Sequence, residues 1–491
     1  MKNNQFTLGA LGLFALGLLA ASPLLRADGS IPSGSLLLLV LCVGPTTLWI
    51  LRGMEGMPLY EMFAGMHLIY YWIPAGREVA QSGFSNEVNA EAIWVISLFL
   101  GASNFVHYSL MRWVKRRGGI RSRIMDLKVS TTDKAHWAWV MFLGAFAFEV
   151  LVQTGFIWRL VDWSVFRPVQ TLFSAFAMLG TFGLAVHLGT GQMRKSLGGL
   201  FLLMLSLLVG LYVVSGFLGG AGSTALIAGF GYMLSSKRVP IITFLVCLAV
   251  GSLLNMGKRE WRYQYWNIEQ RTDIMDRATD FVSFSFKGLN ERLSGQLQDE
   301  HLSATLLERA SLIEILHRTI TLTPRTIPYW GSRTYSYGLS LLVPKWLNPE
   351  RGSIHEAMTE VGMTYGYYHS IDAGDSTNIS IGPIAEAWIS GGWFVVVLAG
   401  AAYGLFFSVG AAMAWGRPVE SIGYLSGVFY FSQLVWLMEV FAGSLVMSFT
   451  RNYFIALMTL VTLALLQGLR RKRDRIAQGA APRPDLAPTA R

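Results

Sequence analysis

Cationic side chains recur through one stretch of the chain that is also rich in aromatic residues. They are Arg309, Arg318, Arg325, Arg333, Lys345 and Arg351. Arginine and lysine bind phosphate oxygens, and the planar guanidinium does so through two parallel hydrogen bonds. Nearby carboxylates could instead pair with several of these cations, namely Glu308, Glu314, Glu350 and Glu356. The pattern therefore predicts either an anion-binding site or a set of ion pairs.

Ionisable residues also occur inside long apolar runs. Glu149 and Glu439 are two such residues, and Glu61, His67 and His107 are others. Charged groups within a membrane are costly and are usually functional. One hypothesis is a polar cavity that opens outward and is lined by Glu149, Glu439 and external arginines. The other is that each residue makes an interhelical hydrogen bond, which is worth only about 0.6–2 kcal/mol.

The composition shows which elements must hold these residues. Of 491 residues, 53% are hydrophobic and only 14% are charged, whereas soluble chains have about 25% charged residues. The two cysteines lie in apolar runs, so no disulfide or thiolate metal site is indicated. The chain has no phosphate-binding glycine loop, HExxH or CxxC, so neither a cofactor nor a metal is predicted. An all-α, polytopic membrane protein is expected, without a nucleic-acid partner.

Runs of about 20 apolar residues predict membrane-spanning helices. About twelve are expected, near 6–25, 33–51, 57–75, 90–113, 136–158, 169–188, 199–217, 221–235, 239–257, 387–414, 422–449 and 453–469. The first resembles a signal peptide but lacks a cleavage site, so an anchor is expected. The third is the weakest because it contains Glu61 and His67.

The distribution of Lys and Arg predicts the orientation of these spans. With the N-terminus in the cytoplasm, inside segments hold 22 Lys and Arg, and short outside segments hold five. Cytoplasmic loops carry such an excess. We therefore expect a multi-pass membrane protein with both termini in the cytoplasm.

Four regions follow from this topology. Residues 1–257 hold spans 1–9, 258–386 form a large periplasmic loop domain, 387–469 hold spans 10–12, and 470–491 form a basic, disordered tail. Within the loop, 268–297 and 303–321 are expected to be helical, with Ser303 as the cap of the second helix. The stretch TIPYWGSRTYSYG that follows is expected to be rich in turns.

Three stretches of the chain carry a resemblance to a known family. They are LLERASLIEILHRTITLTPRTIPYWGSRTYSYG, LLVPKWLNPERG and GDSTNISIGPIAEAWISGGWFVVVLAG. Together they resemble the Wzy-type O-antigen and exopolysaccharide polymerases, over about a quarter of the chain. Lys345 stands where that family has Arg, and Glu350-Arg351 stands where it has Lys-Pro. Glu386 is followed by Ala-Trp in place of a Tyr two residues on.

The resemblance implies a membrane glycosyltransferase of the GT-C type that acts on undecaprenyl-diphosphate-linked oligosaccharides. An acceptor hydroxyl would attack the anomeric carbon with inversion, and undecaprenyl diphosphate would leave, without a metal. Glu386 and Asp375 are then the candidate catalytic carboxylates. The candidate substrate-binding residues are the six cations, Tyr329, Trp330 and Asn378. The aromatic residues, including Tyr335 and Tyr337, could stack on sugars, although an interfacial aromatic belt explains them equally well.

Other functions remain open at this point. An O-antigen ligase would share the external loop and the lipid-diphosphate chemistry. A polysaccharide flippase or transporter is a second alternative, although the chain shows no internal repeat of the kind that transporters often have. A scaffold of an export complex is a third. The expected partners are a lipid-linked oligosaccharide, membrane lipids and, for a polymerase, a chain-length-regulating co-polymerase.

Overall fold

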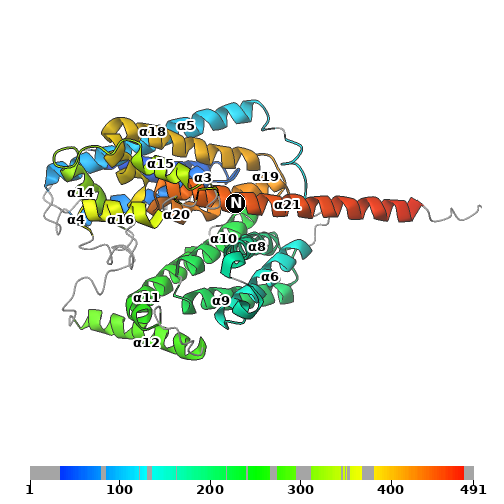
Figure 1. The fold of residues 1–491 in the computed structure, drawn as a ribbon. Helices are drawn as coiled ribbons and strands as arrows, with labels where there is room; N and C mark the ends of the chain where they lie inside the picture. Colours follow the sequence, from blue (N-terminus) through cyan, green and yellow to red (C-terminus); the bar gives the residue numbers. More distant parts are fainter. Residues whose placement is uncertain are drawn as a thin grey trace, which may run out of the picture.

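Two groups of helices make up the described part of the chain, in a computed structural model (Figure 1). The structure describes residues 34–78, 85–120, 122–129, 135–161, 163–216, 218–238, 241–265, 274–294, 311–343, 347–348, 350, 354–367 and 381–479. In these ranges the β structure consists of one isolated bridge, between Lys128 and Ser421. The all-α fold class is therefore confirmed for this part of the chain.

The first group holds the helices nearest the two ends of the chain. Its elements are α2 (Ser35–Leu51), α3 (Leu59–His67), the π-helix η1 (Leu68–Trp72), α4 (Ile73–Glu78), α5 (Asn86–Arg116), α14 (Ile313–Leu322), α15 (Arg333–Ser340), α16 (Ile354–Thr364), α18 (Gly382–Ala414), α19 (Ile422–Ser432), α20 (Leu434–Glu439) and α21 (Ala442–Gly479). The long helices α5 and α18 lie side by side, and α21 extends beyond the group at one end (Figure 1).

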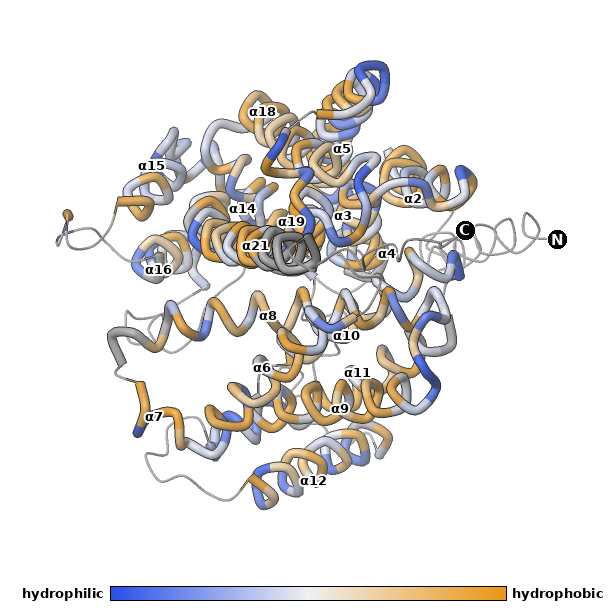
Figure 2. Tube along the Cα trace, turned by 90° about the vertical axis from the view of Figure 1, so that its right-hand side faces the viewer, coloured by the Kyte–Doolittle hydropathy of each residue, from blue (hydrophilic) through white to orange (hydrophobic). Residues whose placement is uncertain are grey.

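The second group is formed by the middle of the chain and is inclined to the first. Its elements are α6 (His136–Gln153), α7 (Ile157–Leu160), α8 (Trp163–Gly189), α9 (Lys195–Val214), α10 (Leu218–Ser236), α11 (Ile241–Tyr265) and α12 (Ile274–Leu293). Most of these helices are strongly apolar along their length, whereas α12 also carries hydrophilic residues (Figure 2). Contacts of α8 with α19 and α21 join the two groups.

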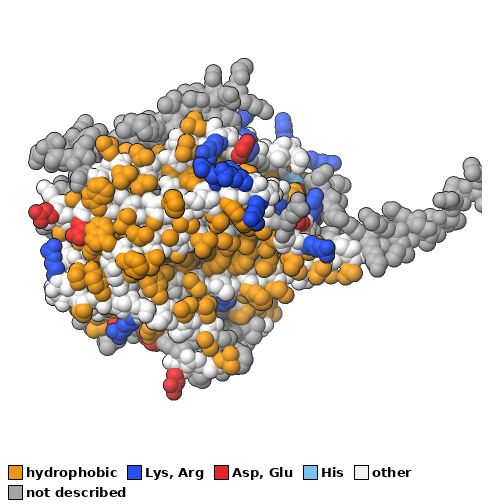
Figure 3. Space-filling view, turned by 90° about the horizontal axis from the view of Figure 1, so that it is seen from above, with side chains coloured by type: hydrophobic (Ala, Val, Ile, Leu, Met, Phe, Trp, Pro, Cys, Tyr) orange, Lys and Arg blue, Asp and Glu red, His pale blue; other side chains and the backbone are white. Residues whose placement is uncertain are grey.

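Six helices in the described part are long and apolar enough to cross a membrane. They are Asn86–Arg116, His136–Gln153, Pro168–Gly189, Lys195–Val214, Gly382–Ala414 and Ser448–Leu469. Large apolar side chains on them point outward, and Phe105, Val140 and Phe394 are each more than 70% exposed. Figure 3 shows one such apolar face. A surface of this kind is unfavourable in water and favourable against lipid, so these helices indicate a multi-pass membrane protein.

Glycines determine how closely α5 and α18 approach. Gly400 and Gly404 lie one turn apart on α18, against the backbone of Phe99 and Ser103 on α5, and a Cβ at either glycine would overlap that backbone. Small residues spaced by four let membrane helices come into backbone contact, where van der Waals packing holds them together. This contact fixes the helix that carries Glu386.

The expected span 422–449 is wrong in its boundaries. The chain breaks after Ser432 and again between Glu439 and Ala442, and one continuous helix then runs from Ala442 to Gly479. Arg451 therefore lies within α21 and not in a connecting segment. In the described chain, α19 and α20 together take the place of the expected span, and α21 takes the place of the next. The helix also includes residues 470–479, which the sequence had placed in a disordered tail.

The other expected spans agree with the helices to different degrees. Span 33–51 coincides with α2, 57–75 with α3, η1 and α4, 221–235 with α10, and 239–257 with α11. These four are not among the six that are long and apolar enough by themselves to cross a membrane. Span 6–25 lies outside the described residues.

The long hydrophilic segment is divided between the two groups. Its first helix, α12, packs on α11 and α9, whereas α14, α15 and α16 belong to the first group. The expected helix 268–297 is observed as α12. The expected helix 303–321 is observed from Ile313, and Ser303 lies outside the described residues. The stretch expected to be rich in turns contains a helix, α15, which crosses the start of α21 where Gly338 meets Gly443.

Candidate active site at the start of α21

Glu386 lies in the first turns of α18 and is completely buried. Its Oε2 accepts a hydrogen bond of 2.6 Å from the backbone N–H of Ala442, the first residue of α21. The first N–H groups of a helix lack partners within the helix, and a negative charge is favourable there. Glu386 therefore caps α21 from a position 56 residues earlier in the chain. Its other oxygen, Oε1, is buried and has no hydrogen bond of ordinary geometry to another described residue.

Glu439 ends α20, three residues before α21 begins, and is only partly buried. Its Oε1 accepts a hydrogen bond of 2.9 Å from the hydroxyl of Tyr70. Tyr70 lies in the π-helix η1, and such bulges are frequent at functional sites. We refer to Tyr70, Glu386, Glu439 and Ala442 as the α21 junction. Of its two carboxylates, Glu439 is the one that solvent can reach.

The start of α14 is attached to the same junction. The backbone N–H of Leu312 donates to the carbonyl of Tyr70, at 3.0 Å. One turn further on, Nε2 of His317 lies 3.0 Å from Oδ1 of Asn89, near the start of α5. Burial lowers the pKa of His317 to about 4, so the ring is neutral at pH 7. Nε2 then carries the proton and donates the hydrogen bond to Oδ1 of Asn89.

The segment after α14 is tied to the first turns of α18. The indole Nε1 of Trp388 donates to the carbonyl of Thr323, at 3.2 Å. The backbone N–H of Trp330 donates to the carbonyl of Ile389, at 2.9 Å. This carbonyl is available because α18 is kinked at Gly391 and Gly392, the second of which has a φ of +61°. These two hydrogen bonds therefore hold the segment that follows α14 against α18, the helix that carries Glu386.

The described cations of this segment differ in their partners. Arg318 donates to the carbonyl of Gly366 and stacks on the ring of Tyr367. Arg333 forms an ion pair with Glu360 and stacks on Trp330. Arg325 is exposed, and no contact of its side chain with another described residue is recorded. Among the three described cations of this segment, Arg325 is therefore the one that a ligand meets without displacing a described partner.

Several predicted site residues lie outside the described residues. These are Arg309, Lys345, Arg351, Asp375 and Asn378. Tyr329 is described, and its hydroxyl would lie 2.6 Å from a Cβ at Gly392. Trp330, whose amide binds α18, lies beside Arg333. The structure thus brings Glu386, Tyr329, Trp330 and Arg333 together on the first turns of α18.

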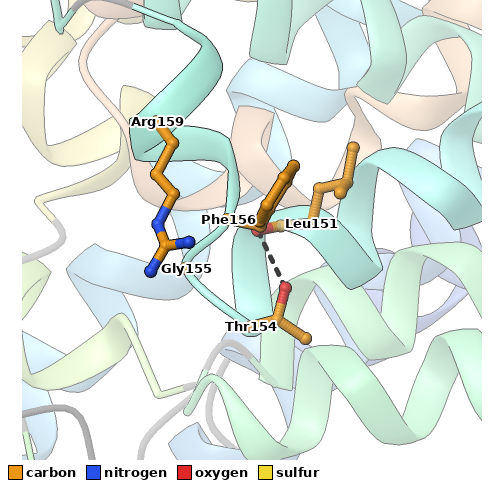
Figure 4. Close-up of a pocket in the computed structure, with 5 residues that line it drawn as sticks. All are labelled: Leu151, Thr154, Gly155, Phe156 and Arg159. Atoms are coloured by element: carbon orange, nitrogen blue, oxygen red, sulfur yellow. Dashed lines mark hydrogen bonds between the residues drawn. The ribbon is translucent and has the colours of Figure 1, made fainter.

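Glu149 lies on α6, in the second group of helices. Its Oε1 accepts a hydrogen bond of 2.7 Å from Nε2 of Gln153 on the same helix. A hollow of about 490 Å³ lies at the end of this helix and is lined by Leu151, Thr154, Gly155, Phe156 and Arg159. Figure 4 shows these residues around the turn that leads into α7. Neither Glu149 nor Glu439 lines this hollow, and they belong to different groups of helices.

The sequence did not single out Tyr70 or the N–H of Ala442. Tyr70 lies 369 residues before Glu439 and is one of several aromatic residues in an apolar run. A backbone amide has no signal in a sequence. The described residues contain no group of three or more His, Cys, Asp and Glu side chains that could hold a metal ion.

Comparison of the chain with protein-family models, with curated proteins and with solved structures gives no match. The chemistry of the junction must therefore be argued from its residues. A half-buried carboxylate, Glu439, is held by a tyrosine hydroxyl beside a segment that carries an exposed guanidinium. A carboxylate held in this way can accept a proton from a hydroxyl group, and an exposed guanidinium can stabilise an anion that leaves.

Proposed function

We propose that this protein polymerises lipid-diphosphate-linked saccharide repeat units at the α21 junction, on the outer face of a bacterial inner membrane. The observation that carries the proposal is the link from Leu312 through Tyr70 to Glu439. It joins the segment that resembles the Wzy-type polymerases to an accessible carboxylate at the ends of apolar helices. The proposed architecture has about twelve spans of the GT-C type and both termini in the cytoplasm.

In this proposal the acceptor hydroxyl of one repeat unit attacks the anomeric carbon of the growing chain. A new C–O bond forms as the bond to the diphosphate breaks, and the configuration inverts. The hydroxyl proton passes to Glu439, and the electron pair leaves with the lipid diphosphate. A positioned general base accelerates such a step by roughly 10²–10⁴-fold. Arg325 stabilises the charge of the leaving diphosphate.

Glu386 has a supporting role in the proposal. Because it is completely buried and bonded to the amide of Ala442, a substrate hydroxyl reaches it only if α21 moves. Its hydrogen bond to the amide of Ala442 holds the start of α21 and so positions Glu439, which lies three residues earlier. The catalytic assignment therefore passes from Glu386, which the resemblance implied, to Glu439.

Purified protein in lipid discs should convert lipid-diphosphate repeat units into a ladder of polymers without any nucleotide sugar. A single product transferred to lipid A core would indicate a ligase. Movement of repeat units across sealed vesicles without polymerisation would indicate a flippase. A strict requirement for a nucleotide sugar would reject the proposal.

Two arginine variants test the anion contact within this assay. Arg325→Ala should lower the rate by roughly 30- to 1,000-fold, as expected when one charge-assisted contact to a developing anion is lost. Arg325→Lys should recover only part of the rate, because lysine cannot make the planar two-point contact. Arg318→Ala is the matched control, since Arg318 is already held by Gly366 and Tyr367. Equal losses for both alanine variants, measured per amount of inserted protein, would remove Arg325 from the site.

A further inference from the structure

A second pocket lies at the other end of the first group, where α2, α5 and α18 end and α3 begins. Its volume is about 470 Å³. Arg52, Arg112, Lys115 and Arg116 line it, and all four are exposed. We refer to it as the basic pocket. Lys and Arg side chains gather in one region of the otherwise apolar face in Figure 3.

The four cations line the pocket together with one exposed carboxylate, Glu55, so positive charges outnumber negative ones at its opening. None of them forms an ion pair with a carboxylate in the part of the chain that the structure describes. Lys115 lies over the ring of Trp415 at 4.5 Å, which holds its ammonium at the opening of the pocket. Like charges brought together in this way repel, so an anion that binds between them is stabilised.

The floor of the basic pocket is polar and buried. Glu61 is 9% exposed and His107 is 2% exposed, and both line the pocket. Nε2 of His107 lies 3.9 Å from Oε1 of Glu61, and Nδ1 of His107 is within 3.0 Å of the hydroxyl of Ser408. Oε2 of Glu61 is buried and has no hydrogen-bond partner among the residues that the structure describes. A buried carboxylate oxygen without a partner is costly, so a bound hydrogen-bond donor would relieve that cost.

The walls between the basic opening and the polar floor are mainly apolar. Trp49, Met57 and Met111 are buried there, and the rings of Tyr108 and Trp415 are partly buried. The basic loops of the chain meet at this end, where the charge pattern places the cytoplasm. Basic pockets between membrane helices on the cytoplasmic side are suited to the head groups of anionic lipids.

We propose that the basic pocket binds a phosphate ester that carries a hydroxyl group, such as a phosphoglycerol. The phosphate lies among Arg112, Lys115 and Arg116, and the hydroxyl donates to Oε2 of Glu61. The phosphoglycerol group can come from a membrane lipid or from a soluble ester, and both present the same chemistry to the pocket. This site is separate from the α21 junction, so it stands whether or not the proposed polymerase activity is found.

Binding can be measured with the full chain in detergent, by native mass spectrometry and thermal stability. The probes are phosphatidylglycerol, phosphatidylcholine, glycerol 3-phosphate and inorganic phosphate. Phosphatidylglycerol should bind at least about 10-fold more tightly than phosphatidylcholine, which lacks the hydroxyl and has no net charge. Saturable binding of glycerol 3-phosphate as well would show that soluble esters also enter. Binding of phosphatidylglycerol alone would assign the pocket to lipid.

Alanine variants at the C-terminal end of α5 provide a matched comparison of lipid binding. Arg116→Ala should weaken phosphatidylglycerol binding by about 10-fold, the usual worth of one charge-assisted hydrogen bond. Arg117→Ala is the control, because Arg117 stacks on Trp113 and does not line the pocket. Glu61→Gln keeps an oxygen acceptor and should retain most of the binding, whereas Glu61→Met should lose the preference for a glycerol head group. Equal weakening by Arg116→Ala and Arg117→Ala, or equal affinity for the two lipids, would overturn the proposal.

Discussion

Two carboxylates near the start of α21 differ in exposure, and the difference separates their roles. Glu386 is completely buried and bonded to the amide of Ala442, whereas Glu439 is partly exposed and bonded to Tyr70. Glu439→Gln should therefore lower polymerisation by roughly 10²–10⁴-fold at normal abundance, because an amide cannot accept the proton. Glu386→Ala should instead destabilise the fold by about 1–2 kcal/mol, as the loss of a helix cap does.

Rates and amounts must be measured separately in this comparison. The polymer formed per inserted protein gives the rate, and the quantity of protein in the membrane reports the stability. Glu386→Gln keeps an oxygen that accepts from Ala442, so most of the protein should be retained. A Glu439→Gln protein that polymerises at the normal rate would contradict the assignment of the base.

The arginines show how much of a site a sequence can predict. Their types predicted anion contacts or ion pairs, and among the three described arginines the structure shows an ion pair for one. Arg333 pairs with Glu360, and Arg318 binds a carbonyl and a ring. Arg325 remains exposed. The outcome depends on which groups the fold brings within 4 Å, and spacing along the chain does not determine that.

At the scale of elements, six of the expected spans coincide with helices long and apolar enough to cross a membrane, because the length of such a run is a consequence of bilayer thickness. The break in the chain before α21 was not predicted. The sequence placed a boundary at Arg451 and Asn452, which are polar, whereas the helix passes through them. It begins at Ala442 because Glu386 supplies a cap from another helix. A cap of that kind requires a tertiary contact, and the adjacent residues do not predict it.

The docking of α14 on α5 should depend on pH through His317. Its folded pKa of about 4 is below the unfolded value near 6.5, so the unfolded segment binds more protons between these values. The contribution of this contact to the free energy of unfolding is fully present above pH 6.5. Up to about 3 kcal/mol of it is lost as the pH falls to 4. The protection factors of the amides of residues 313–322, which correct for the intrinsic exchange rate, should therefore fall on acidification.

A variant without the titrating ring provides the control for this exchange experiment. The side-chain N–H of His317→Gln can still donate to Asn89, so its exchange should not change in this pH range beyond the intrinsic chemical rate. Equal acid sensitivity in both proteins would assign the effect to other groups.

At the scale of the whole molecule, the two ends of the first group differ in charge and in the elements that they carry. One end carries the α21 junction and helices α14, α15 and α16. The other carries the basic pocket, the pair between Arg417 and Asp126, and the bond from Lys237 to the carbonyl of Met54. Loops that are far apart in the sequence but rich in Lys and Arg thus meet at one end. That is the arrangement expected when this end faces the cytoplasm.

Cysteine labelling can test this orientation at two exposed positions of the first group. Thr364 ends α16, and Lys128 lies in the segment paired with Ser421. The exposed Cys247 is first replaced by serine, and the buried Cys42 is kept. With the α21 junction outside, Thr364→Cys should react with an impermeant maleimide in intact spheroplasts. Lys128→Cys should react only after the membrane is broken, because the excess of basic residues holds that end in the cytoplasm. The reverse pattern would place α14, α15 and α16 in the cytoplasm, where a lipid-linked oligosaccharide that has crossed the membrane cannot reach them.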